Sequence, residues 1–285
     1  MRQFRVAVLN IVMPLPHSPG RYVELLQAAY RQRRIVSLRG DYAGMLGALD
    51  TQGEVISGQF YKFFNLNVDS SWFNLSNQQE AEPGDLAQIR VPPHLKPHHL
   101  AISFVFVPQR HRLIFVTRDG HESLSSGMAK SLLDSLFSDV ELTQLFGEIE
   151  ITIEPSREQL RRIFAMPRLK KLSIEVSPPN PDDLDEAERD VLDRMSEERA
   201  QRMSVELMSK HPRGLQPDEK HKLLAKVAQS NGKVSGHGED ETGNVITLST
   251  ADHPLIKVVT YDPNIQTRNH ALSVEAQALV QALRD

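Results

Sequence analysis

The sequence predicts an α+β protein built as two interleaved strand/helix halves with mixed or antiparallel sheets. Strand-like apolar runs alternate with helix-like stripes along all 285 residues. At ~100–200 residues per domain, this length suits two closely associated halves. No glycine-rich strand-to-helix turn appears, which argues against a doubly wound parallel sheet. We place an N-terminal α+β half at 1–146 and a C-terminal α+β half at 147–285.

The first half begins with an apolar strand at 4–12. Ser18 and Pro19 then give an N-cap followed by proline at the first helical position, and Ser125 can cap a second helix that ends near Phe137. A short helical turn to Phe146 bridges the halves. The other predicted elements are strands at 34–38, 43–49 and 54–68, a polar connection at 76–97, and a hairpin of 100–107 with 112–118.

The second half opens with a predicted β-α-β unit, made of a strand at 148–154, a helix at 156–165 and a strand at 169–176. Asn180 and Pro181 then predict a helix start, with Asn180 as the N-cap. The remaining predicted elements are strands near 203–208, 233–237, 244–249 and 255–260, a helix from Pro217 ended by a left-handed cap at Asn231-Gly232, and a helix at 273–283.

Composition excludes several classes of protein. The absence of cysteine rules out disulfides, thiolate metal ligands and cysteine nucleophiles. No apolar run approaches the roughly 20 residues of a membrane span, so we expect a cytoplasmic protein with no membrane partner. The net charge of −4 does not suit a protein that coats nucleic acid with its whole surface. Any such binding must use a local patch.

Charge is segregated within the second half. Residues 156–171 carry six bases against Glu158 alone, a net +5, whereas 178–198 carry nine acids against two arginines, a net −7. The basic segment is a candidate phosphate-contacting patch. The alternative is that the two segments pair with each other or with a second subunit.

A second set of bases surrounds a predicted helix N-terminus and could contact phosphate, although a solvated helix face is the favoured interpretation: Lys210, His211, Arg213, Lys220, His221, Lys222 and Lys226. The aromatic segment Trp72-Phe73-Asn74 could stack on bases, or it could pack at the end of a strand.

Histidines gather around the central hairpin, but their spacing matches no zinc signature: His94, His98, His99, His111 and His121. His237 before an acidic run is similar. Ser249, Asp252 and His253 lack the glycine-flanked elbow of a nucleophilic serine. We assign no catalytic residue, no metal and no cofactor, and we leave open whether the protein is an enzyme.

Several segments together resemble a bacterial family catalogued only as a domain of unknown function, over nearly the whole chain: 38–41, 72–74, 111–115, 146–151, 167–174, 177–183, 231–232 and 248–250. More distantly, 147 to about 190 is similar to RexA of the Rex phage-exclusion system. That similarity implies a fold related to the recombination-associated protein RdgC, a homodimer that grips duplex DNA without sequence preference, and a place in anti-phage defence.

The leading functional hypothesis is therefore a nucleic-acid-binding protein of anti-phage defence, with non-specific duplex DNA as the expected ligand. The predicted contacts are Arg157, Arg161, Arg162, Arg168, Lys170 and Lys171. The alternative is a protein-interaction or regulatory subunit of a defence operon that binds its partner through the acidic 178–198 helix, at Asp182, Asp183, Asp185 and Glu186. A third hypothesis is a metal-dependent nuclease that uses Asp182, Asp183 or the histidines.

Overall fold

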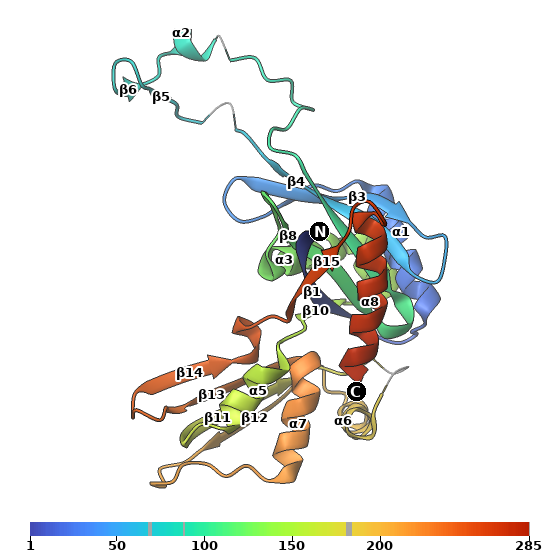
Figure 1. Ribbon diagram of the computed structural model, residues 1–285, viewed down its shortest axis with the longest axis vertical. Helices are drawn as coiled ribbons and strands as arrows, with labels where there is room; N and C mark the ends of the chain where they lie inside the picture. Colours follow the sequence, from blue (N-terminus) through green and yellow to red (C-terminus); the bar gives the residue numbers. More distant parts are fainter. Residues whose placement is uncertain (68–69, 88, 181–183, 285) are drawn as a thin grey trace.

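The protein contains two packed sheets, each with its own hydrophobic core (Figure 1). The structure is a computed structural model that describes residues 1–67, 70–87, 89–180 and 184–284. Every strand pair in these ranges is antiparallel, which confirms the predicted α+β class.

The larger sheet has nine strands in the order β10-β1-β8-β7-β4-β3-β2, with β15 paired to β1 and β9 paired to β8. Its strands are β1 (Arg2–Val12), β2 (Val36–Ser37), β3 (Tyr42–Asp50), β4 (Ile56–Phe64), β7 (Leu100–Val107), β8 (Arg112–Asp119), β9 (Glu122–Ser123), β10 (Glu150–Ile153) and β15 (Ile256–Tyr261). Its helices are α1 (Pro19–Gln32), α3 (Ser126–Phe137), α4 (Val140–Phe146) and α8 (Arg268–Arg284).

Helices cover both faces of this sheet, which explains why its central strands read as unbroken apolar runs. On β7, Phe106 packs against Tyr22 of α1, with 5.7 Å between ring centroids. Ser103 lies on the opposite face of β7, and its hydroxyl donates to Asn269 of α8 at 3.0 Å. The predicted caps of α1 and α3 are confirmed, because Ser18 and Ser125 each accept a backbone N–H from the first turn of their helix.

The smaller sheet has the order β12-β11-β13-β14 and lies next to the larger one (Figure 1). Its strands are β11 (Arg168–Val176), β12 (Met203–Met208), β13 (Gly232–Glu239) and β14 (Val245–Ser249). Helices α5 (Arg157–Phe164), α6 (Glu186–Glu197) and α7 (Glu219–Ser230) complete its core, with short 3-10 turns η1 (Pro108–Arg110) and η2 (Thr250–Asp252) elsewhere in the chain.

A long arm leaves the body between β4 and β7 (Figure 1). It carries β5 (Phe73–Asn74), β6 (Gln79–Glu80) and α2 (Pro83–Leu86), so the predicted connection at 76–97 contains short regular elements. The side-chain amide of Asn74 donates to Asp85 at 2.9 Å. Phe73 is 62% exposed, so it does not pack as a core aromatic.

The predicted β-α-β unit does not form one sheet. Its first strand, β10, pairs with β1 in the larger sheet, whereas β11 pairs with β12 and β13 in the smaller one. A short connecting helix shows that two strands are neighbours in the chain, but it does not determine which sheet buries each of them. Because β10, β15 and α8 all pack in the larger core, the division between the cores does not coincide with the predicted boundary at 146/147.

The smaller core is connected to the larger one by two segments that run side by side. Pro155 and Pro254 form an isolated antiparallel bridge. Ser156 N donates to His253 O, and Leu255 N donates to Glu154 O, each at 2.8 Å. The chain therefore enters and leaves the smaller core at neighbouring points.

Two predicted helix caps are wrong. The N-cap of α6 is Asp185, which forms a capping box with Glu188, whereas Asn180 is buried against β1. The reciprocal hydrogen bonds of the box satisfy two N–H groups that a distant asparagine could not reach. Pro181, Asp182 and Asp183 lie outside the described residues. Gly232 is not a left-handed cap either, because Asn231 ends α7 and Gly232 begins β13.

Candidate functional site

A cleft with a volume of about 600 Å³ lies where the two cores meet. Residues from η1, β8, α5, α6, α7 and α8 line it, together with Glu154, which follows β10, and the segment that leads into α6. The basic side chains in its lining are Arg110, Arg112, Arg157, Arg161 and Lys226. The acidic side chains are Glu154, Asp185 and Glu188. The lining also contains the apolar residues Leu160, Phe164, Leu184, Val227, Val280 and Leu283.

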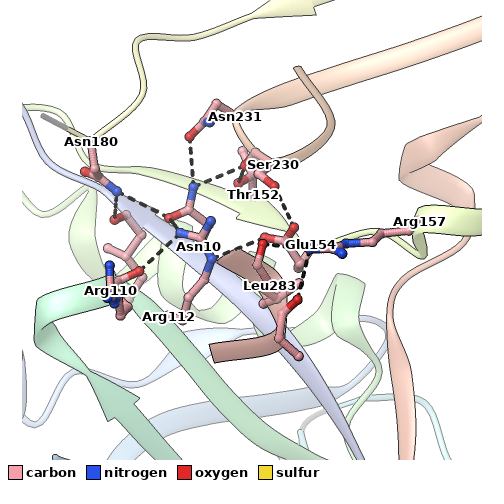
Figure 2. A network of polar contacts seen from close by, with 12 residues as sticks. Asn10, Arg110, Arg112, Thr152, Glu154, Arg157, Asn180, Ser230, Asn231 and Leu283 are labelled. Carbon is pink, nitrogen blue, oxygen red and sulfur yellow. Dashed lines mark hydrogen bonds and ion pairs between the residues drawn. The ribbon is translucent and has the colours of Figure 1, made fainter. Parts of the chain in front are cut away.

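Beside the cleft, a buried network of polar side chains joins the two cores (Figure 2). Asn10 of β1 donates its amide to Ser230 O at 3.1 Å and to Asn231 Oδ1 at 3.2 Å. Its oxygen accepts from Arg112 and, at 3.3 Å, from Asn180. All four hydrogen-bonding positions of the Asn10 amide are therefore occupied, as the burial of this side chain requires.

Glu154 is a buried carboxylate in the cleft lining, 3% exposed. Its Oε1 accepts the Ser230 hydroxyl at 2.6 Å, and its Oε2 lies 3.2 Å from Arg112 Nε as an ion pair. The geometry of that ion pair is not that of a hydrogen bond, so Oε2 accepts none from the described residues. The arginine offsets the cost of burying the charge, but one oxygen keeps unused acceptor capacity.

Glu188 lies on the other side of the cleft, on α6. Burial raises the pKa of its carboxyl group, and the Asp185 backbone N–H opposes this by donating to it. Asn231 also donates to Glu188, at 3.1 Å, which links the helix to the Asn10 network. A carboxyl with a raised pKa in a cleft is a common feature of functional sites.

The cations at the mouth of the cleft are held in different ways. Arg157 donates to the carbonyl oxygens of Ala282 and Leu283 at the end of α8, at 3.0 and 2.8 Å (Figure 2). Lys226 lies 3.8 Å from Asp185. Arg161 is exposed and lies one turn after Arg157 on α5. Among the described residues, no carboxylate pairs with Arg157 or Arg161.

The six predicted contact residues do not form one patch. Arg168 and Lys170 both bind Glu239 of β13, at 2.9 and 2.5 Å. Their hydrogen bonds hold the pKa of Glu239 below its usual range, Lys170 having the larger effect. Lys171 pairs with Glu206 of β12 at 2.7 Å. The carboxylates come from neighbouring strands and not from the acidic helix, because cross-strand pairing places them directly beside the bases.

The remaining predicted residues divide between the cleft and the surface. Arg157 and Arg161 line the cleft, whereas Arg162 lies on α5 outside its lining and donates to Gln159 at 3.4 Å. Of the predicted partner-binding residues, Asp185 caps α6 beside the cleft and Glu186 is exposed on that helix. Asp182 and Asp183 lie outside the described residues.

The other sequence candidates have local structural roles. Ser249 accepts from Ala251 N at 3.2 Å as the cap of η2, and the His237 ring lies 2.9 Å from the Thr247 hydroxyl. In the second basic cluster, Lys222 pairs with Glu219 at 2.7 Å. Within the described residues, no group of three or more histidine or carboxylate side chains could hold a metal ion. None of the helices in these ranges is long and apolar enough to cross a lipid bilayer.

Comparison with known protein families adds one finding. The family model described as "Domain of unknown function (DUF4747)" matches residues 2–277. The chain belongs to the DUF4747 family. The match includes both cores and every residue of the cleft except Val280 and Leu283. None of the curated proteins compared with this DUF4747 chain matches it.

Sequence reasoning missed most of the cleft. Arg110, Arg112 and Glu154 were not singled out, and Asn10 was treated only as part of an apolar strand. One signal was available, because an asparagine inside a buried apolar run must find hydrogen-bond partners. The partners themselves come from residues 102 to 221 positions away, so no local pattern could reveal them.

Proposed function

We propose that the protein binds nucleic acid at the cleft between its two cores. The observation that carries the proposal is the position of Arg157 and Arg161. Both line the cleft together with Arg110 and Lys226. Among the described residues, neither Arg157 nor Arg161 is paired with a carboxylate, whereas Lys226 lies near Asp185. Phosphate contacts by such cations release counterions and supply most of the affinity of non-specific nucleic-acid binding.

This proposal moves the contact surface away from the basic segment as a whole. Arg168, Lys170 and Lys171 are in ion pairs on the smaller sheet, so they have less positive charge to offer to a polyanion. The contact set becomes the two arginines of α5 together with Arg110 and Lys226. The cations then come from both cores, which a single stretch of sequence could not supply.

Fluorescence anisotropy with labelled oligonucleotides tests the proposal. Single-stranded DNA, duplex DNA and RNA of equal length should be compared over a range of salt concentrations. Arg161→Glu should raise the Kd by about tenfold and flatten the salt dependence, because one phosphate contact is replaced by repulsion. Arg162→Glu is the matched control, since it makes the same charge change at the next residue of α5, outside the cleft lining.

Two results would contradict the proposal. One is an absence of oligonucleotide binding at low salt. The other is equal weakening by Arg161→Glu and Arg162→Glu, which would indicate a general charge effect and no contact specific to the cleft. Circular dichroism of both variants should match that of the unmodified protein, so that misfolding does not explain a loss.

The proposed role in anti-phage defence and the homodimer rest on the similarity to RexA and extend the same proposal. Cells that express the protein should plate phage less efficiently than cells that express Arg161→Glu. Light scattering after gel filtration measures the mass of the protein against 32.2 kDa for one chain. A monomeric mass would contradict the homodimer, and equal plating in both strains would contradict the role in defence. Neither result bears on nucleic-acid binding, which anisotropy tests.

A second candidate function is binding of a protein partner through α6. Its acidic side chains Glu186, Asp190, Asp193 and Glu197 are exposed, whereas Val191 and Met195 hold the helix to the core. Crosslinking in native extracts, compared between the unmodified protein and Asp190→Lys/Asp193→Lys, tests this role. Loss of a crosslinked partner in the variant supports it, and an identical pattern contradicts it.

A further inference from the structure

The cleft lining combines cations, carboxylates and apolar side chains, of which a site for bare phosphate needs only the cations. Arginines are suited to phosphate, but carboxylates in the same cavity repel it. Both Glu154 and Glu188 line the cleft together with the arginines of α5. A ligand that suits both must carry negative charge at one end and hydrogen-bond donors at the other.

Glu188 is the acceptor for such donors. Its carboxyl group lines the cleft and is only partly buried, and among the described residues it accepts one hydrogen bond from Asp185 N and one from Asn231, which leaves acceptor capacity on both oxygens. Glu154 is closed to a ligand, because its Oε2 is buried and lies 3.2 Å from Arg112 Nε. Sugar hydroxyls and the exocyclic amino groups of bases are donors that carboxylates bind.

An apolar wall completes the cleft. Leu160 and Phe164 from α5 line the cleft together with Val280 and Leu283 from α8. An aromatic side chain beside aliphatic groups offers a flat base a surface on which to stack. Arg157 connects this wall to the cationic side, because it donates to the carbonyls of Ala282 and Leu283 and keeps further N–H groups for a phosphate.

The size of the cleft limits the ligand. Its volume of about 600 Å³ is in the range of roughly 300–1,000 Å³ that is usual for sites of small ligands. A cavity of this size suits a ligand of about one nucleotide unit.

We infer that the cleft binds one nucleotide unit, with its phosphate at Arg157 and Arg161, its base against Phe164, and a sugar or base donor at Glu188. This inference rests on the proposed function and specifies which part of a nucleic acid enters the cleft. A free mononucleotide and the 5′-phosphorylated end of a strand share this chemistry, and the experiment below separates them.

Isothermal titration calorimetry of the full chain should compare inorganic phosphate, ribose 5-phosphate and the four ribonucleoside 5′-monophosphates. At least one nucleotide should bind about tenfold more tightly than phosphate. Phe164→Leu should reduce that preference and leave phosphate binding unchanged. Arg161→Ala should weaken both ligands, and Arg162→Ala, outside the lining, should weaken neither.

Glu188→Gln tests the acceptor. It should lower nucleotide affinity severalfold and leave inorganic phosphate affinity equal or higher, because a repelling charge is removed. Glu197→Gln, at an exposed position of the same helix outside the lining, is the control and should change neither affinity. Thermal unfolding of each variant identifies any that fail to fold.

Equal affinity for phosphate and all nucleotides would overturn the inference, as would a preference insensitive to Phe164→Leu and Glu188→Gln. Oligonucleotide binding that depends on Arg161 but is unaffected by saturating mononucleotide would overturn the inference and leave the proposed function standing. Nucleotide binding without any oligonucleotide binding would end the proposed function and assign the cleft to the free nucleotide. Displacement of a 5′-phosphorylated oligonucleotide, but not of its unphosphorylated form, would assign it to a strand end.

Discussion

At the scale of single residues, the Asn10 side chain bonds to four other residues of the buried network. It lies in an otherwise apolar strand and makes hydrogen bonds to residues of both cores. Burial of an amide is favourable only when its hydrogen bonds are made, because an unpaired buried polar group costs about 1–3 kcal/mol. The same side chain therefore stabilises the protein and determines how the cores meet.

Asn10→Leu should lower the free energy of unfolding by about 3 kcal/mol, because Asn180, Asn231 and Arg112 each lose one hydrogen-bond partner in a buried site. Urea denaturation followed by circular dichroism measures the change. Asn264→Leu, at an exposed turn position, is the control and should have little effect. A loss below about 1 kcal/mol for Asn10→Leu would mean that the network rearranges without cost.

Glu188 predicts a pH dependence of stability. Its pKa in the folded state is raised above the ordinary value of 4.5, mainly by burial, so the folded protein binds its proton more tightly than the unfolded chain does. Its contribution is therefore most favourable below the unfolded pKa and is lost as the pH rises through the folded pKa.

Glu188→Gln should remove that contribution. The difference in urea midpoint between the variant and the unmodified protein should change in favour of the variant as the pH rises from about 4 to 7, the interval that begins near the ordinary value of a glutamate. A difference that stays constant with pH would show that Glu188 titrates alike in both states. Glu197→Gln, an exposed position on the same helix, provides the comparison.

At the scale of elements, the pairing of β11 with β13 requires a glycine where β13 begins. A Cβ atom at Gly232 would lie 2.0 Å from the carbonyl oxygen of Glu175, much closer than atoms can approach. The backbones are in contact here because Gly232 pairs with Val176 at the start of the ladder. The sequence pair Asn231-Gly232 therefore marks a close approach of two strands and not a left-handed helix cap.

Gly232→Ala should destabilise the protein by about 2–3 kcal/mol, since the strands must separate to admit the methyl group. Gly127→Ala is the control, because nothing lies within 4 Å of the added Cβ on α3. There the substitution should stabilise the helix by roughly 0.5–1 kcal/mol. Thermal and urea unfolding should thus show a loss of stability for Gly232→Ala and a gain for Gly127→Ala. Equal changes in the two variants would contradict the described contact.

The sequence predicted the elements well where local signals decide them. Ser18 and Ser125 cap helices as expected, and the hairpin of β7 and β8 follows from two apolar runs around Pro108. It failed where distant residues decide. The sheet that receives β10 and the carboxylate that pairs with Lys170 both depend on contacts far along the chain. Most residues of the cleft could not be predicted for the same reason.

At the scale of the whole molecule, the arm between β4 and β7 adds little to either core. Its base is closed by hydrogen bonds from Phe64 N to Pro97 O at 2.9 Å and from Asn65 N to Asp41 O at 2.6 Å. Phe73, Leu75 and Leu95 on it are more than half exposed. The arm therefore buries little apolar surface that could stabilise the body.

Replacement of residues 68–95 by a short Gly-Ser linker should change the free energy of unfolding by less than about 1 kcal/mol, because such loops tolerate shortening when their ends are close. Chemical denaturation measures this, with anisotropy on the same sample reporting whether nucleic-acid binding at the cleft is retained. A loss of several kcal/mol would show that the arm packs on the body in solution.

The bridge between Pro155 and Pro254 means that the chain is nested. The larger core is formed by two stretches of the chain, before and after residues 155–254. The smaller core is formed by the residues between them. Insertions of this kind are tolerated when their ends are adjacent, because the host keeps its own connections. The smaller core can thus be inserted, exchanged or deleted as one unit, and the cleft between the two cores would be present only when the smaller core is.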